Sequence, residues 1–272
     1  MPDMTNILTT IAARTRERVA ERKRQVPPED VAKRARRQAA LELEREGSFA
    51  FPFEAALRKP GMSFICEAKK ASPSKGVIAE DFPYLSIARD YERAGAAAIS
   101  CLTEPYWFLG ADEYLAQIAK AVSIPVLRKD FVVDEYMVYE AKLLGASAVL
   151  LICAILDDEQ LASYVALAHE LGMTALVEAY AADEVPRAIA AGAQVIGVNN
   201  RDLRSFSVDF DNSIRLRKLV GEGRVYVSES GVQTREDVAR LEEAGVDAVL
   251  IGETLMRAAD KRAMLDQLRG AA

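Results

Sequence analysis

The sequence predicts an α/β fold, a (β/α)8 barrel (TIM barrel) preceded by an N-terminal helical extension. Two observations carry this prediction: eight short apolar segments separated by helix-length stretches, and a phrase that recurs along the chain. In this phrase a helix ends in glycine, and a small residue and a β-branched run follow it. The predicted strands are spaced roughly twenty to thirty-five residues apart, which leaves room for a crossover helix. They end near Lys69, Thr103, Lys129, Ile152, Glu178, Asn199, Glu229 and Gly252.

The recurring phrase places glycine where a helix needs a left-handed cap, a conformation that glycine adopts without a Cβ clash. The strands that follow are apolar on both faces, which is typical of a buried parallel sheet. Three further strands, at 63–69, 124–131 and 224–230, have the same character without the phrase. Eight such units fit a barrel, whereas a doubly wound open sheet, the alternative, normally has fewer strands and a Gly-rich first turn. The predicted caps are Gly95, Gly145, Gly172, Gly192 and Gly245.

The segment before the first strand predicts helices. Ile7, Leu8, Ile11 and Val19 recur at roughly helical spacing, and a second helical pattern begins after two prolines. We expect residues 1–60 to pack on the barrel of residues 61–272, so that the whole chain is a single domain. Residues 14–45 hold eleven Lys and Arg against six Asp and Glu, which favours a solvated helical face over a polyanion-binding patch.

Composition excludes several classes of protein. The net charge of −6 gives no support to nucleic-acid binding. Cys66, Cys101 and Cys153 lie far apart in apolar runs, which predicts reduced core residues. The single histidine, His169, argues against a His-rich zinc site or a Ser-His-Asp triad. With no apolar leader or membrane-length apolar stretch in the sequence, we expect a cytoplasmic protein without membrane contact. We expect a monomer or weak homo-oligomer.

Ionisable and polar side chains gather at the predicted carboxyl ends of the strands, where the active sites of such barrels lie. Alternation along the first strand puts Glu67 and Lys69 on one face and Cys66 on the other. A plain salt bridge explains any one pair, but a charge at a barrel mouth is costly unless it is paired or used. The side chains concerned are Glu67, Lys69, Lys129, Glu178, Asn199, Arg201, Glu229 and Ser230.

Two loops predict a phosphate site. SESG at 228–231 and IGET at 251–254 follow the last two strands, where barrels often hold phosphate on backbone N–H groups. Gly231 and Gly252 permit close approach of the backbone to a ligand, although tight turns without a ligand look similar. Tyr106, Trp107 and Phe108 follow the second strand and either wall an aryl ring or pack in the core.

These segments resemble the indole-3-glycerol phosphate synthase family of tryptophan biosynthesis. The resemblance runs in order from about residue 50 to residue 257, through FICEAKKASPSKG, CLTEPYWFLG, PVLRKDF, TALVEAY, IGVNNRDLRSF, YVSESGV and VLIGETLMR. It implies a carboxy-lyase that closes and decarboxylates 1-(2-carboxyphenylamino)-1-deoxyribulose 5-phosphate to indole-3-glycerol phosphate, CO2 and water. This sugar phosphate is the only partner implied, and no cofactor or metal is.

The resemblance also implies catalytic roles. Lys129 matches the general acid that protonates the ketone oxygen during ring closure, and Glu178 matches the carboxylate active in dehydration. Lys69 matches a lysine that contacts the substrate carboxylate and delivers a proton, with Glu67 orienting it. A lysine suits acid catalysis if neighbouring cations or burial lower its pKa towards neutrality.

The remaining matches concern binding. Asn199 and Ser230 match residues that hold the sugar hydroxyls, Arg201 lines the same pocket, and Ser72 lies near the anthranilate end. Phosphate binding is implied for the Gly231, Gly252 and Glu253 amides, and contact with the aryl ring for Phe131 and Trp107.

Two departures and two rivals remain. The chain has Ala179 and Tyr180 where the family commonly has a small β-branched residue and then His, and its strand-2 loop reads EPYWFLG. A phosphoribosylanthranilate isomerase needs a cysteine base facing the lumen, whereas Cys66 is predicted to face away. A catalytically silent sugar-phosphate-binding barrel has no need for Lys69, Lys129 and Glu178 together.

Overall fold

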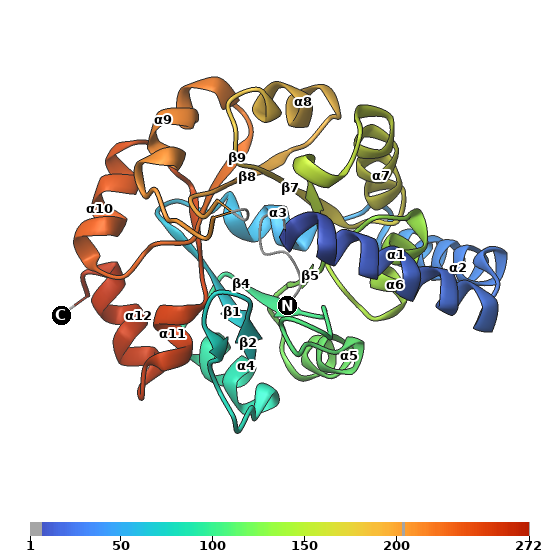
Figure 1. The fold of residues 1–272 in the computed structure, drawn as a ribbon, viewed down its shortest axis with the longest axis horizontal. Helices are drawn as coiled ribbons and strands as arrows, with labels where there is room; N and C mark the ends of the chain where they lie inside the picture. Colours follow the sequence, from blue (N-terminus) through green and yellow to red (C-terminus); the bar gives the residue numbers. More distant parts are fainter. Residues whose placement is uncertain (1–6, 203–204, 272) are drawn as a thin grey trace.

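Eight parallel strands close into a barrel ringed by helices (Figure 1) in the computed structural model, which describes residues 7–202 and 205–271. Neighbours around the barrel follow chain order, and β1 pairs with both β4 and β10. This closure confirms the predicted barrel and excludes the open sheet. The barrel strands are β1 (Ser63–Ala68), β4 (Ala98–Leu102), β5 (Val126–Lys129), β6 (Ala148–Ile152), β7 (Thr174–Ala179), β8 (Val195–Asn199), β9 (Val225–Glu229) and β10 (Ala248–Ile251).

The helices follow the predicted alternation, and each strand ends within one residue of its predicted position. All five predicted cap glycines have positive φ, from 72° at Gly172 to 88° at Gly192. The loop after β1 contains a short hairpin, β2 (Ala71–Ser72) and β3 (Gly76–Val77). The helices are α1 (Ile7–Gln25), α2 (Pro28–Glu46), α3 (Pro52–Leu57), α4 (Tyr84–Arg93), α5 (Asp112–Ala121), α6 (Glu135–Leu143), 3-10 helix η2 (Cys153–Ile155), α7 (Asp158–Glu170), α8 (Glu184–Ala190), α9 (Asp211–Val220), α10 (Arg235–Glu243), α11 (Glu253–Arg257) and α12 (Lys261–Arg269).

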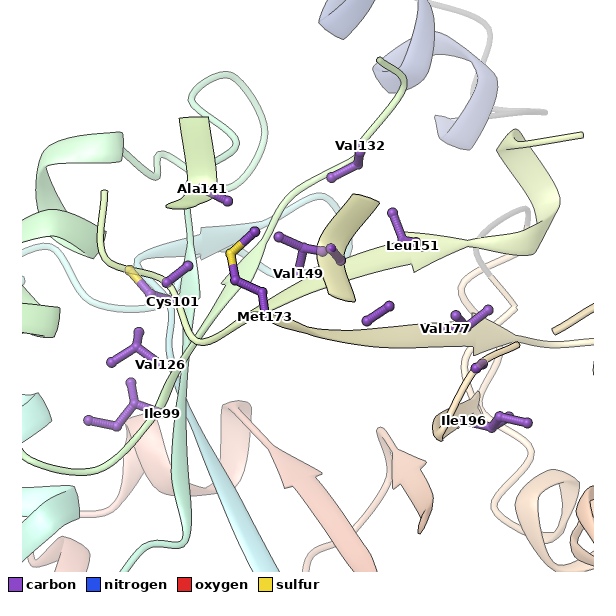
Figure 2. Close-up of a cluster of buried hydrophobic side chains, with 14 of the residues drawn as sticks. Ile99, Cys101, Val126, Val132, Ala141, Val149, Leu151, Met173, Val177 and Ile196 are labelled. Carbon is purple, nitrogen blue, oxygen red and sulfur yellow. The ribbon is translucent and has the colours of Figure 1, made fainter. Parts of the chain in front are cut away.

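Alternation along the strands divides their side chains between two buried clusters. Outward side chains such as Ile99, Val149 and Val177 pack beneath the helices (Figure 2). Inward side chains such as Leu127 and Leu176 fill the barrel. The interior is therefore a packed core, and charged groups are confined to its carboxyl end. All three cysteines are buried with free thiols, as predicted.

Helix α3 lies at the amino ends of the strands. Phe53 and Leu57 join the inward cluster, and the Arg58 guanidinium donates a hydrogen bond of 3.0 Å to the Gly223 carbonyl, just before β9. This packing places the barrel opening at the other end, where the strands terminate.

Helix α1 begins at that opening and runs outward over α6 (Figure 1), and its apolar residues Ile7, Leu8 and Ile11 belong to the inward cluster. Among the described residues, no helix is long and apolar enough to span a membrane.

The basic face of α1 is only partly solvated. Arg18 contacts Asp130 at 2.9 Å, and Arg22 contacts Asp112 at 2.6 Å. The interpretation as a solvated face is therefore wrong for these two residues, because carboxylates of the barrel neutralise them. The interpretation as a solvated face is correct for residues such as Arg24, whose side chain is 69% exposed.

Asp130 fixes α1 to the end of β5. It accepts hydrogen bonds from both Arg18, at 2.9 Å, and the Thr103 hydroxyl, at 2.7 Å. The fully buried Arg128 lies 3.7 Å away and also contacts Asp112 at 2.9 Å. Since Asp130 stands between Lys129 and Phe131, this buried cluster holds α1 beside two predicted site residues.

Replacing Asp130 by Asn should lower the free energy of unfolding by about 3 kcal/mol, because the largely buried Arg18 then lacks a carboxylate partner. Urea unfolding measures the change. The control is Glu17→Gln, which breaks an exposed pair with Arg14 and should leave the midpoint unchanged. Equal losses in the two variants would contradict the assigned role of Asp130.

Candidate active site

A cavity of about 880 Å³ opens at the carboxyl ends of the strands and is bordered by α1 and the β1–α4 loop. It brings together all the predicted site residues except Trp107. Those that line it are Glu67, Lys69, Ser72, Lys129, Phe131, Glu178, Asn199, Arg201, Ser230, Gly231, Gly252 and Glu253.

Lys129 lies at the centre of the charged groups. Its Nζ atom is 3.4 Å from Glu229 Oε2 and 3.6 Å from Glu178 Oε2. Burial alone lowers the pKa of a lysine, but Glu229, Glu178 and Glu67 outweigh burial and raise the pKa of Lys129 above its ordinary value. The condition of a lysine pKa lowered towards neutrality is therefore not met at Lys129, because its neighbours are glutamates and not cations. The side chain is an ammonium ion at neutral pH.

Glu67 and Lys69 form the second charged pair. Their Oε1 and Nζ atoms lie 2.5 Å apart, and the Ser100 hydroxyl donates to Glu67 at 3.4 Å. Burial opposes ionisation of Glu67, but Lys69 and Lys129 together hold its pKa below the ordinary value. The predicted alternation is confirmed, since Cys66 packs in the outward cluster.

Asn199 links the two sides of the cavity. Its amide nitrogen donates to Glu178 at 3.2 Å, and its oxygen accepts from the Ser230 hydroxyl at 2.9 Å. Ser230 has a φ of 70°, a strained value for a residue with a side chain, and the Asn200 amide holds its carbonyl at 3.0 Å. Gly231 follows with a φ of 94°. The backbone after β9 therefore turns sharply and leaves Ser230 against Asn199.

Glu229 belongs to the ionisable side chains predicted at the strand ends and lines the cavity, but the family resemblance assigns no role to it. It is buried, and among the described residues neither carboxylate oxygen has a hydrogen-bond partner. Burial raises the pKa of Glu229 to about 8, with Glu178 adding to the shift and Lys129 opposing it. Alternation along β9 accounts for its position in the cavity, because Val225, Val227 and Glu229 share the inward face of the strand.

The aromatic wall differs from the prediction. Phe108, and not Trp107, lines the cavity, with its ring centroid 5.9 Å from that of Phe131. The reason is Glu104, a buried carboxylate that accepts backbone N–H bonds from Tyr106, Trp107 and Phe108 at 2.9, 2.7 and 3.0 Å. These bonds wind the loop so that Phe108 is the residue presented to the cavity.

The predicted phosphate end is formed by Gly231, Gly252 and the start of α11. The Glu253 carboxylate points to cations, with Oε1 3.4 Å from Lys75 and 3.1 Å from Arg257. Despite partial burial, these two cations hold the pKa of Glu253 below its ordinary value. Lys75 and Arg257 thus neutralise the negative charge of Glu253 at the end of the cavity that is predicted to bind phosphate.

The departure at the end of β7, Ala179 and Tyr180, lies away from the aromatic wall, whereas the departure in the strand-2 loop forms part of that wall through Phe108. Ala179 packs in the outward cluster, and Tyr180 lines a neighbouring cavity of about 670 Å³ that shares Glu178 and Asn199 with the first. In the part of the chain that the structure describes, no three His, Cys, Asp or Glu side chains are grouped as metal ligands.

A closed (β/α)8 barrel with paired lysines and glutamates around one deep cavity defines a barrel enzyme. The chain belongs to the indole-3-glycerol phosphate synthase family of carboxy-lyases, whose sequence pattern it matches over residues 8–268.

Relatives of that name are similar over almost their whole length. One from Ruminiclostridium cellulolyticum is 53% identical, covering 98% of this chain and all of its own. One from Lachnoclostridium phytofermentans is 48% identical, covering 97% of this chain and 98% of its own.

Solved structures share the fold at low sequence identity. The 3-hexulose-6-phosphate synthase of Salmonella typhimurium superposes with a TM-score of 0.63 at 17% identity, covering 77% of this chain and 98% of its own. Thiamine phosphate pyrophosphorylase from Pyrococcus furiosus gives 0.58 at 15% identity, covering 77% and 94%.

The raised pKa of Glu229 predicts a dependence of stability on pH. Between its ordinary value of 4.5 and about 8, the folded protein binds a proton that the unfolded chain has released. The contribution of Glu229 to stability therefore falls as pH rises through this range. In Glu229→Gln this contribution is absent, so the urea midpoint should fall less between pH 5 and pH 8 than in the wild type.

Glu222→Gln, the same substitution on the exposed turn before β9, is the control and should follow the wild-type curve. Parallel curves for Glu229→Gln and the wild type would show that Glu229 titrates normally.

Proposed function

We propose that this cavity closes, decarboxylates and dehydrates 1-(2-carboxyphenylamino)-1-deoxyribulose 5-phosphate, with Lys129, Lys69 and Glu178 moving the protons. The observation that carries this assignment of residues is the charged Lys129, set between Glu178 and Glu229 inside the cavity. A buried cation with oxygens of Glu229 and Glu178 at 3.4 and 3.6 Å suits a reaction that develops negative charge on oxygen and later needs a base.

In the first step the ring carbon bearing the carboxylate attacks the ketone carbon of the sugar chain. A carbon–carbon bond forms, the carbonyl π electrons move onto oxygen, and Lys129 supplies the proton that makes this oxygen a hydroxyl. The raised pKa of Lys129 keeps the proton in place until the oxygen becomes basic. The ammonium group thus stabilises the developing oxyanion before it transfers the proton.

Loss of CO2 then returns an electron pair to the ring and restores its aromaticity. In the last step Glu178 removes a proton from the methylene carbon next to nitrogen, and Lys69 protonates the departing hydroxyl, which leaves as water. Glu67, 2.5 Å from Lys69, orients that ammonium group. Asn199 holds the Glu178 carboxylate through its hydrogen bond of 3.2 Å.

Substrate binding uses the rest of the lining. Phe108, in the place expected for Trp107, and Phe131 flank the aryl ring, and Ser72 lies at the carboxylate end. Arg201, Asn199 and Ser230 hold the sugar hydroxyls, and the amides of Gly231, Gly252 and Glu253 bind the phosphate. The chain acts as a monomer or weak homo-oligomer in the cytoplasm.

The rival readings lack support from the site. Cys66 packs outward, and burial raises the pKa of its thiol, so it does not supply the lumen-facing base of an isomerase. A silent binding barrel gives no reason for two lysines and three glutamates around one cavity.

Replacing Lys129 by Ala should lower kcat roughly 10²- to 10⁴-fold, because ring closure loses its proton donor. Indole fluorescence follows turnover of the carboxyphenylamino-deoxyribulose phosphate, and calorimetry with a reduced substrate analogue follows binding, which should persist. Lys120→Ala, an exposed lysine of α5, is the control and should retain wild-type turnover. A wild-type protein that forms no indole product would overturn the function, and an active Lys129→Ala would overturn the role of the residue.

A further inference from the structure

Gly197 stands at an inward position of β8 where the backbone itself does not require glycine. It pairs with Glu178 of β7 and Val227 of β9 and does not have positive φ. A Cβ atom built on Gly197 would lie 2.4 Å from Glu229 Oε1 and 3.2 Å from Leu176 Cδ1. The Glu229 carboxylate therefore lies in the space that a side chain at position 197 would fill.

Gly252, just after β10, repeats this arrangement two strands further around the barrel. Its φ of −114° is open to any residue. A Cβ atom here would lie 2.4 Å from Glu67 Oε1 and 2.8 Å from Lys69 Nζ. Apart from any contact of its backbone with phosphate, Gly252 leaves room for the Glu67–Lys69 pair.

At both glycines, the space that a side chain would fill is occupied by a glutamate carboxylate, and this carboxylate contacts a proposed proton donor. Glu229 lies 3.4 Å from Lys129, and Glu67 lies 2.5 Å from Lys69. We infer that Gly197 and Gly252 are positioning residues for the reaction, because each reserves the volume in which a glutamate holds its lysine. This inference rests on the proposed function.

A methyl group at position 197 has a defined consequence. Glu229 is buried and has Glu178 as a carboxylate neighbour, so displacement of its carboxylate from β8 changes both its distance to Lys129 and the repulsion between the two glutamates. Displacement of the Glu229 carboxylate leaves the residues that contact the phosphate and the aryl ring of the substrate in place. The effect should therefore fall on kcat and on its pH dependence, and not on KM.

The test is a double-mutant cycle of Gly197→Ala with Glu229→Ala. In the wild-type background Gly197→Ala should lower kcat roughly 10- to 100-fold and leave KM within about threefold, as expected for a displacement of about 1 Å. In the Glu229→Ala background the methyl group meets no carboxylate, so Gly197→Ala should cause no further loss. An equal loss in both backgrounds would assign the effect to general packing and overturn the inference.

Gly252→Ala gives the parallel cycle with Glu67→Ala. If Gly197→Ala does not fold, Glu229→Ala must restore folding, and failure to do so overturns the inference.

Gly192→Ala is the control: at φ +88°, with no described atom within 4 Å of its Cβ, it strains the backbone and should lower Tm without changing kcat. Wild-type turnover is measured first. If the wild-type protein forms no indole product, the proposed function is overturned. If the wild type is active but the losses in kcat of the two substitutions simply add, only the positioning role of the glycines is overturned.

Discussion

The burial of Lys129 among three glutamates is the constraint on which the rest of the site depends. A lone ammonium group inside a barrel loses its hydration and releases its proton easily, but Glu229, Glu178 and Glu67 reverse that tendency and raise its pKa. Glu229 and Glu178 both contact Lys129, and Lys129 also helps to hold the pKa of Glu67 below its ordinary value. The site therefore behaves as one coupled set of charges.

The fold maintains this set by confining the charged side chains of the interior to one level of the barrel. Leu127, Leu176 and Val227 fill the interior below it, so water does not reach the lysine from beneath. From outside, Asp130 holds α1 through Arg18 at 2.9 Å and thereby fixes the backbone that follows Lys129. The same buried cluster that stabilises the N-terminal helix thus also holds the strand end that carries the proton donor.

The barrel could be predicted from the sequence because the patterns that indicate it are local. A glycine cap such as Gly145 and the inward alternation of Glu67 and Lys69 can be predicted from a few neighbouring residues, and the structure has both. The direction of the Lys129 pKa shift could not be predicted, because the neighbours of Lys129 come from other strands and their distances are not written in the sequence. The contact of Phe108, and not Trp107, with the cavity could not be predicted. It depends on a turn held by three backbone N–H bonds to Glu104, which the amino-acid composition does not reveal.

The two inward glycines show how a coupled set of charges fits inside a barrel of ordinary size. Carboxylates and lysines at one level need volume, and a barrel with a side chain at every inward position has none to spare. Gly197 on β8 and Gly252 after β10 are two strands apart in the ring, and at each position a Cβ atom would lie 2.4 Å from one glutamate oxygen. The missing side chains are thus as much a part of the charge arrangement as the charged groups, because a side chain at either position would displace a glutamate carboxylate.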